Sequence, residues 1–261
     1  MLKNRVIPVL LMKDNFCVKP RCFEHPGRNV GVMSQYIKNM NSRNIDELIL
    51  LDIDTVIPNF TKISDLLKHL FCPVTVGGGV ATLNDIENLL RFGADKVCIG
   101  SNNINFKFIE EAAKKFGSQA IVISIDFKTI SKKLVRSWTN LEYTFIYNVY
   151  IQKGKIYANI DAVTLAKKVA DHGAGEIILT DIERDGTRMG YNLKAVSEVS
   201  KAVSIPVIAN GGCEGFNDMA KAFDNGANAV AASTIFLFTA VTPNNCSEYL
   251  NIHGYKTRVE T

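Results

Sequence analysis

The sequence predicts a (β/α)8 barrel, the TIM-barrel architecture, built from two duplicated half-barrels in a single domain of residues 1–261. Three observations predict this fold class. Short apolar runs alternate with amphipathic stretches, the two halves of the chain repeat each other, and 261 residues suit one such barrel. The alternation alone also allows a doubly wound open sheet, and the internal repeat favours the barrel.

Eight apolar runs are expected to form the strands. They are apolar throughout, which is typical of a parallel sheet that is buried on both faces. In chain order, the predicted strands are residues 5–11, 47–52, 72–76, 95–99, 120–126, 176–180, 205–209 and 228–233.

An amphipathic stretch follows each run and predicts a helix. The predicted helices are residues 32–43, 61–70, 83–92, 106–116, 162–172, 193–203, 216–225 and 247–253. Glycines just past several helix ends, such as Gly93 and Gly226, are the expected stops. An insertion at about residues 129–159, after the fifth strand, has alternating residues that predict an extra hairpin laid over the mouth of the barrel.

An internal duplication relates the two halves of the chain. Residues 46–54 (DELILLDID) and 175–183 (GEIILTDIE) are identical at five of nine positions. The spacing from Gly79 to Gly93 is 14 residues, and the spacing from Gly212 to Gly226 is the same. Matching residues at matching spacing predict two half-barrels related by a pseudo-twofold axis.

Composition excludes several other classes of protein. Lys and Arg exceed Asp and Glu by 30 − 26 = 4, and this small scattered charge does not favour binding to nucleic acid or to a membrane. Apolar runs are too short for a spanning helix, and the six cysteines form no CxxC pair. We therefore expect a cytoplasmic protein with free thiols and without a metal or cofactor.

Glycines at the predicted strand ends suggest two phosphate sites. Gly79 with Gly100 and Ser101 forms one group, and Gly212 with Ser233 and Thr234 forms the other. A glycine at such a place lets the backbone approach a phosphate closely. The alternative interpretation is that these glycines only make tight turns between strand and helix.

Carboxylates gather at the same strand ends, where they could act as acids or bases. The candidates are Asp52, Asp126, Asp181 and Asp185. Their alternative role is to cap a helix or to form a surface salt bridge. The loop at residues 13–31 is a candidate lid, and its Lys19 suits a phosphorylated ligand.

Charged residues also begin four of the predicted strands, at the end where a barrel is normally closed by apolar layers. They are Arg5, Glu47, Lys96 and Glu176. Four converging charges could form a structural plug of ion pairs. They could equally gate a passage, and the residues alone leave both possibilities open.

The chain resembles the cyclase subunits of imidazole glycerol phosphate synthase. The motifs that carry this resemblance are RVIP, DELILLDI, TVGGG, GADKV, FGSQAIVISID, GAGEIILTDIERDGT and GANAVAAS. The resemblance implies a barrel of two halves that binds a substrate with a phosphate at each end. It also implies ammonia from a separate glutaminase subunit docked at the amino-terminal face of the barrel.

The resemblance assigns further roles to residues of this chain. The ammonia gate corresponds to Arg5, Glu47, Lys96 and Glu176, and Asp95 corresponds to a residue at the glutaminase interface. The substrate-binding candidates are Lys19, Asp52, Asp181 and Asp185. Phosphate-binding residues correspond to Gly79, Gly100, Ser101, Gly186, Gly212, Ser233 and Thr234.

One catalytic residue departs from the family pattern. The two catalytic aspartates of the cyclases correspond to Leu11 and Asp126, and a leucine cannot transfer a proton. An intact gate beside Leu11 resembles a paralogue that supplies ammonia to a third protein, which amidinates a sugar of bacterial surface polysaccharides such as the lipopolysaccharide O-antigen. The alternatives are an authentic cyclase of histidine biosynthesis, the related isomerase of that pathway, and a non-catalytic barrel that activates a glutaminase.

Overall fold

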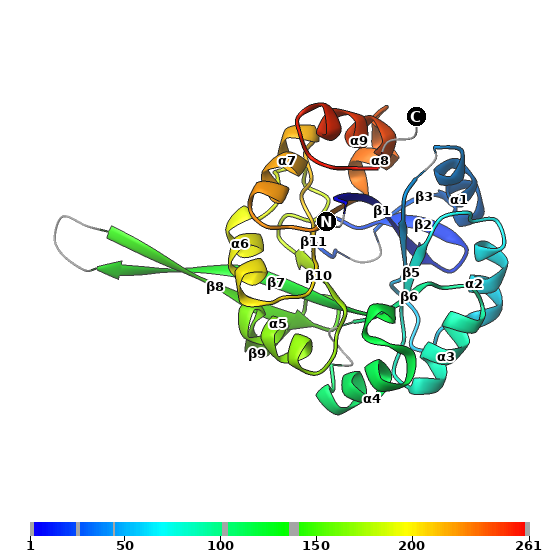
Figure 1. Cartoon of the computed structure of the whole chain (residues 1–261), viewed down its shortest axis with the longest axis horizontal. Coiled ribbons are helices and arrows are strands. Elements are labelled where there is room, and N and C mark those ends of the chain that lie inside the picture. The colour runs from blue at the N-terminus through cyan, green and yellow to red at the C-terminus, as the bar shows by residue number, and fades with distance from the viewer. Residues whose placement is uncertain (1–2, 25–26, 44, 101–103, 136–140, 259–261) are drawn as a thin grey trace.

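Eight parallel strands of the described chain close into a barrel that is surrounded by helices (Figure 1). The computed structural model describes residues 3–24, 27–43, 45–100, 104–135 and 141–258, and their side chains except in 132–135 and 141–143. The barrel strands are β1 (Arg5–Lys13), β4 (Leu48–Asp52), β5 (Val74–Gly77), β6 (Lys96–Ile99), β7 (Ile121–Val135), β10 (Glu176–Asp181), β11 (Val207–Asn210) and β12 (Ala229–Ala232). Pairing of β7 with β10 closes the ring, and the predicted (β/α)8 fold is confirmed.

Helices follow the barrel strands as the periodicity predicts. They are α1 (Met33–Ser42), α2 (Phe60–Leu67), α3 (Leu83–Arg91), α4 (Phe106–Phe116), α5 (Ala162–Asp171), α6 (Leu193–Ala202), α7 (Phe216–Asp224), α8 (Thr234–Phe238) and α9 (Pro243–Ile252). The short α8 was not predicted. Thr82 and Asp85 form a reciprocal capping box at the start of α3, and Gly93 ends that helix with a φ of 106°.

Two apolar clusters fill the molecule. One lies inside the barrel and includes Ile7, Val9, Leu11, Val122 and Ile178. The other lies between the strands and the helices and is larger. Successive residues of each strand alternate between the two clusters, which explains why the strands are apolar throughout.

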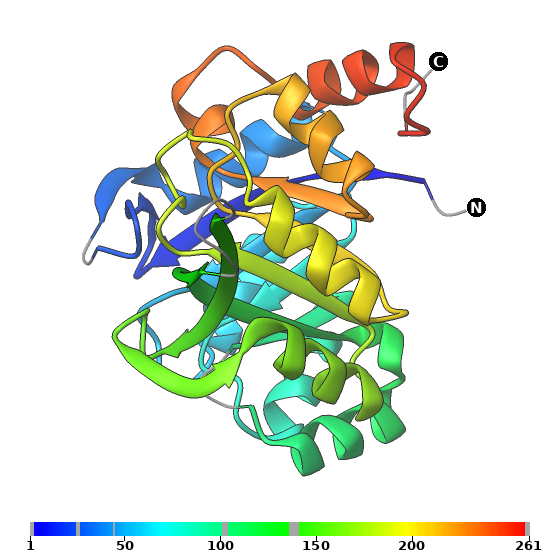
Figure 2. The same ribbon diagram turned by 90° about the vertical axis from the view of Figure 1, so that its left-hand side faces the viewer.

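A small hairpin replaces the loop that the sequence predicts at residues 13–31. Strand β1 runs on beyond the barrel to Lys13 and pairs with β2 (Phe16–Lys19), which pairs in turn with β3 (Arg28–Val32). Figure 2 shows this hairpin at the end of the molecule opposite to the two chain termini. Four or five residues are too few for a periodic signal, and the hairpin depends on β1 as a template.

The insertion after β7 forms an arm rather than a cover for the mouth. β7 continues to Val135 and pairs with β8 (Leu141–Ile151) over its whole outer part. β8 then pairs with β9 (Ile156–Asp161), which leads into α5. In Figure 1 the β7–β8 arm projects away from the barrel, beyond the ring of helices. Unbroken pairing along both strands accounts for its straight course.

No helix of the described residues is long and apolar enough to cross a membrane. The six cysteines are free thiols.

Candidate functional site

The carboxyl ends of the barrel strands meet at one face, which we call the mouth, and strand alternation decides which side chains enter it. Leu11 ends the interior row of β1 and belongs to the interior cluster. On β7, Asp126 lies four residues after the interior residue Val122, so the two side chains face the same side of the strand. The two residues that the duplication pairs therefore both face the inside of the barrel.

Asp52 and Asp181 end β4 and β10 but face away from the interior. The Asp52 carboxylate accepts a hydrogen bond from the Asp54 amide at 3.2 Å. Asp181 accepts from the Glu183 amide at 3.0 Å and from the Asn192 side chain at 2.7 Å. Burial raises the pKa of both carboxyls. Both residues fix the loop that follows their strand, and their role in substrate binding stays a prediction.

Polar side chains line the interior on the second half of the barrel. The Ser124 hydroxyl donates to the Asp126 carboxylate at 3.1 Å. On the neighbouring strands, the Asn210 amide donates to the Thr180 hydroxyl at 3.1 Å. Asp126 therefore stands in a hydrogen-bonding environment that is suited to proton transfer.

A small pocket, which we call the phosphate pocket after its predicted ligand, lies at the ends of β11 and β12. The Ser233 hydroxyl in its wall is buried and has no hydrogen-bond partner among the residues that the structure describes. Gly212 lies beside it with a φ of +96°, and a Cβ there would be 2.4 Å from the Gly190 carbonyl oxygen. An orphaned hydroxyl and glycine backbone in the wall of a pocket suit an anion such as phosphate. Gly186 and Thr234 also line this pocket.

The twofold-related site in the first half is only partly described. Gly79 has a φ of +68°, and a Cβ there would lie 2.8 Å from the Ile57 amide nitrogen. No atom would come within 4 Å of a Cβ on Gly100 among the described residues. Ser101, predicted to bind phosphate, lies outside the described residues.

Lys19 and Asp185 form a buried pair beside the phosphate pocket. The Lys19 ammonium lies 2.9 and 3.0 Å from the two carboxylate oxygens. The Cys22 amide donates to the Asp185 carbonyl at 2.8 Å, which holds the end of β2 against the loop after β10. The structure thus brings together two substrate-binding candidates that are 166 residues apart.

The turn between β8 and β9 reaches the mouth from the other side. Lys153 on this turn contacts the Asp54 carboxylate at 2.7 Å, and Lys13 contacts the same carboxylate at 3.1 Å. A Cβ on Gly154 would lie 3.3 Å from Ile182 and 3.4 Å from Phe23. The turn is therefore packed against the loops after β2 and β10.

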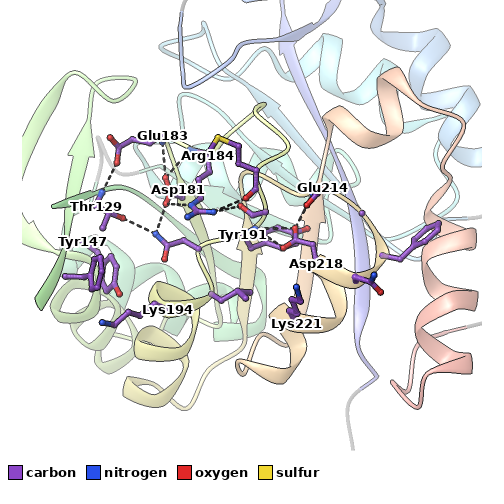
Figure 3. Close-up of a pocket in the computed structure, with 18 of the residues that line it drawn as sticks. Thr129, Tyr147, Asp181, Glu183, Arg184, Tyr191, Lys194, Glu214, Asp218 and Lys221 are labelled. Atoms are coloured by element: carbon purple, nitrogen blue, oxygen red, sulfur yellow. Dashed lines mark hydrogen bonds and ion pairs between the residues drawn. The ribbon is translucent and has the colours of Figure 1, made fainter. Parts of the chain in front are cut away.

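A groove of about 1040 Å³ lies outside the mouth, between the base of the arm and the amino-terminal ends of α6 and α7 (Figure 3). Phe145 and Tyr147 line it from the arm, and Lys194 lies 4.0 Å from the centre of the Phe145 ring. The loop at residues 183–191 separates this outer groove from the phosphate pocket. Asp218 on α7 accepts hydrogen bonds from the Tyr191 and Glu214 amides.

The four charged residues at the opposite end form a closed ring, which we call the floor ring. Arg5 pairs with Glu47 at 2.7 Å and also with Glu176, while Lys96 contacts the same two carboxylates at 2.8 and 2.9 Å. Burial opposes ionisation of Glu47, but Arg5 and Lys96 outweigh it and lower the pKa of this carboxyl. Burial likewise opposes the charge of Arg5, yet its pairing with Glu176 and Glu47 raises the pKa of the guanidinium.

Asp95 lies at the floor end of the barrel, where it binds the neighbouring backbone. Its carboxylate accepts from the Val74 amide at 2.8 Å, and its own amide donates to the Val74 carbonyl at 3.0 Å. Through these two hydrogen bonds Asp95 has a structural role in addition to its predicted role at the glutaminase interface. Phe71, in the loop before β5, is 90% exposed.

Sequence reasoning missed several residues at the mouth. Thr180 ends a predicted strand that is otherwise mostly apolar, and Asn210 lies one residue beyond the predicted strand 205–209, before two glycines. No pattern in the sequence indicates a role for Lys153, because its partner Asp54 is 99 residues away along the chain. Asp218 resembled an ordinary residue in the first turn of a helix.

Comparisons with known proteins agree with this architecture. A family model described as "Histidine biosynthesis protein" matches residues 5–242. The chain is 37% identical over 265 residues to imidazole glycerol phosphate synthase subunit HisF of Clostridium botulinum (strain Okra / Type B1), covering 99% of this chain and 100% of that protein. It is 39% identical over 268 residues to the same subunit of Bacillus cereus (strain AH187), with equal coverage. For Hydrogenobaculum sp. (strain Y04AAS1) the identity is 38% over 265 residues, also at 99% and 100%. The chain therefore belongs to the histidine biosynthesis protein family and is a relative of its HisF cyclase subunits.

Proposed function

We propose that this chain is the cyclase subunit of a glutamine amidotransferase of the imidazole glycerol phosphate synthase type. A separate glutaminase subunit docks at the floor, and its ammonia passes the floor ring to a phosphorylated substrate at the mouth. The names of the relatives support this proposal. The observation that carries it is the floor ring, because burying two glutamates beside two half-buried cations is costly and gives little net stability by itself.

Lys96 is the member of the ring that is suited to move. Its side chain is 22% exposed and forms two hydrogen bonds, while Arg5 holds Glu47 and Glu176 together independently. Rotation of Lys96 toward solvent leaves the other three residues in place and opens one side of the ring. Ammonia is neutral, so it crosses the apolar interior at much lower cost than ammonium.

At the mouth, the phosphate pocket at Ser233 and Gly212 anchors the substrate. Asp126 then accepts or returns a proton as ammonia adds to the substrate, and Ser124 keeps the carboxylate oriented. Leu11, which the duplication pairs with Asp126, cannot transfer a proton. A cyclase reaction in this chain therefore depends on Asp126 alone among the two paired positions.

Leu11 favours a second candidate function. In it, the barrel receives ammonia in the same way but passes it to a third protein that amidinates a sugar for surface polysaccharide. Leu11 beside the complete floor ring favours this function, whereas the names of the relatives favour the histidine cyclase. Both candidates share the glutaminase partner and the floor ring, and they differ in the chemistry at the mouth.

A cyclase assay on the isolated chain separates the candidates. The substrate is the two-phosphate cyclase substrate, and excess ammonium salt removes the need for a glutaminase. Turnover near that of a HisF relative supports the histidine cyclase and rules out the sugar candidate. If the unmodified chain shows no turnover and the Leu11→Asp variant does, the result supports the second candidate. Asp126→Asn in the Leu11→Asp background is the matched control and should abolish the gained activity.

A further inference from the structure

The β7–β8 arm has two edges, and the backbone shows which groups face each of them. The Phe127 carbonyl accepts a hydrogen bond from the Ile182 amide at 2.9 Å, and the Thr129 amide donates to the Glu183 carboxylate at 3.0 Å. Odd-numbered residues of β7 therefore direct their amides and carbonyls away from β8, and even-numbered residues bond to it. Since the register pairs odd-numbered residues with odd-numbered ones, the odd-numbered residues of β8 face the outer edge of that strand.

The outer edge of β8 lacks a strand partner over its distal part. β9 pairs with β8 only at Asn148, Tyr150 and Ile151, and β7 lies on the other side. Between residues 141 and 147, the outward amides and carbonyls therefore meet no other strand of the described chain. Such an edge is a template to which a further strand can add.

The outer edge of β7 is better protected than that of β8. Residues 128–135 of β7 include three lysines, and lysines on an edge strand oppose the addition of another strand. Glu183 also occupies the Thr129 amide on this edge. By contrast, residues 141–147 of β8 (LEYTFIY) include one charged residue, and the last five are aromatic or β-branched. Strand addition is therefore favoured at the edge of β8.

The unpaired segment of β8 is complementary to a second copy of itself. When two segments run antiparallel and meet at Thr144, Tyr143 lies opposite Phe145 of the second copy, and the two threonines lie opposite each other. Cross-strand pairs of aromatic residues and of threonines stabilise a sheet. This register also brings the outward amides and carbonyls of both strands together. Glu142 lies opposite Ile146, so the two glutamates stay apart.

We infer that two copies of this chain associate through the outer edges of their β8 strands, which join the two arms into one antiparallel sheet. A single hairpin is at best marginally stable in water, and joining two hairpins gives a sheet of sufficient size. The arm projects sideways from the ring of helices, across the direction from floor to mouth (Figures 1 and 2). The association therefore leaves both ends of the barrel uncovered and is independent of the proposed function.

Analytical ultracentrifugation of the complete chain tests this inference. A contact of one strand pair is small, so the parent should shift from monomer to dimer between about 1 and 300 µM. Tyr143→Pro removes an outward amide and spares the bonds between β7 and β8, as a proline on an edge strand does. It should weaken dimerisation about 30-fold, because each copy loses a hydrogen bond. Ser131→Pro is the matched control, since it removes an outward amide on the β7 edge and should dimerise like the parent.

A charge exchange at Thr144 tests the register. The Thr144 side chain is exposed, and the proposed axis sets it opposite its own copy. Thr144→Lys and Thr144→Glu should each dimerise more weakly than the parent, because like charges lie opposite each other. An equal mixture of the two variants should form a mixed dimer about tenfold more tightly than either variant alone. Recovery in the mixture shows that both variants are folded.

Three results would overturn the inference. The first is a parent that stays monomeric up to about 300 µM, a concentration at which a small interface forms, and this result would leave the edge for a different protein. The second is equal dimerisation, or equal loss of it, in Tyr143→Pro and Ser131→Pro. The third is a mixture of the Thr144 variants that associates no better than each variant alone.

Discussion

Asp218 holds together the two loops that form the phosphate pocket. Its carboxylate accepts from the Tyr191 amide at 3.0 and 3.2 Å and from the Glu214 amide at 3.1 Å. The neighbouring Gly190 amide donates to the Gly212 carbonyl at 2.8 Å. The position of Gly212 therefore depends on a residue that lies outside the pocket, in the wall of the outer groove.

We predict that Asp218→Ala weakens inorganic phosphate binding about tenfold and lowers the free energy of unfolding by about 1–3 kcal/mol, because two amides lose their acceptor. Asp218→Asn keeps one acceptor oxygen and should show a smaller loss. Calorimetry and thermal melting measure both effects. Asp224→Ala is the matched control on the same helix, since the Asp224 carboxylate accepts a hydrogen bond from the Tyr255 hydroxyl at 2.8 Å and lines neither the pocket nor the outer groove as described. Unchanged phosphate affinity in Asp218→Ala would contradict the positioning role.

The floor ring makes a separate prediction about coupling. Lys96→Met should leave the barrel folded but lower the product formed per glutamine hydrolysed by the complex, because ammonia leaks or is blocked at the floor. Lys114→Met is the control, since Lys114 forms an exposed helical pair with Glu110. Identical coupling in the two variants would reject the gate and leave a structural plug.

The lowered pKa of Glu47 gives the ring a pH dependence. The folded protein binds this proton only at lower pH than the unfolded chain does. The stabilisation from Glu47 is therefore complete above about pH 4.3 and is lost as pH falls below that value. Melting temperatures between pH 7 and pH 3.5 should fall less steeply in Glu47→Gln than in the parent. If the melting temperatures of the two proteins fall equally with pH, Glu47 does not contribute to the loss of stability in acid.

At the scale of elements, the β7–β8 arm is largely independent of the barrel. Its outer strands pair with each other from Ile130 with Ile146 to Val135 with Leu141. Its base is tied to the barrel, where the Tyr147 hydroxyl donates to Glu198 of α6 at 3.2 Å. Tyr147 also packs edge-on against Phe127 at 5.5 Å between ring centres.

We predict that replacing residues 133–143 by a two-residue Asn-Gly turn, which keeps Lys132 opposite Thr144, leaves the melting temperature of the barrel within about 2 °C, because the described backbone of the removed strand residues pairs within the arm. Tyr147→Ala, at the base, should destabilise by about 3–5 kcal/mol because a buried aromatic ring is lost. Differential scanning calorimetry compares the two. A large loss in the shortened chain would mean that the arm supports the barrel.

The elements show where sequence reasoning succeeded and where it failed. The barrel strands were predictable because each is a short apolar run between helical stretches. The β2–β3 hairpin was not, since it forms only because β1 extends to Lys13. The outward direction of Asp52 and Asp181 depends on strand parity, and a boundary error of one residue reverses it.

At the scale of the whole molecule, the two ends of the described chain lie together at the floor. The Asn4 amide donates to the Lys256 carbonyl at 2.8 Å, and Asn4 forms a bridge with Thr257. Figure 2 shows both termini on the side opposite to the mouth. A linker at the floor can therefore connect the two ends of the chain, and new ends can be made elsewhere in the sequence.

We predict that a circular permutant joined by a linker of about eight residues, with new ends between residues 136 and 140, folds and melts within a few degrees of the parent. New ends inside β10, between Leu179 and Thr180, should prevent folding because this strand is fully buried. Circular dichroism distinguishes the two constructions. Failure of the first permutant would show that the arm must be continuous for the barrel to close.

The duplication, visible in the sequence, predicted much of the site. It placed the paired positions of Leu11 and Asp126 at one level, and it indicated two related phosphate sites. It could not predict the contacts between the halves. Each half extends its first barrel strand and adds two antiparallel strands, β2 and β3 in one half and β8 and β9 in the other. Lys19 on β2 contacts Asp185 after β10, and Lys153 in the turn between β8 and β9 contacts Asp54 after β4.

The floor ring departs from the twofold symmetry of the chain. The duplication relates three pairs of positions at this level: Glu47 with Glu176, Arg5 with Ala120, and Lys96 with Ala229. The two glutamates are counterparts of each other, whereas Arg5 and Lys96 each have an alanine as counterpart.

Strand neighbours explain why. Arg5 lies beside Ala229, and Lys96 lies beside Ala120, one residue before the first pair of β6 with β7. An ancestor with both bases in each half would have set an arginine next to a lysine on two strand pairs, and such neighbours repel each other. Alanine at one position of each pair avoids that repulsion, and the remaining two cations each reach both glutamates across the barrel. The closed ring at the floor therefore requires that the two halves differ at these positions.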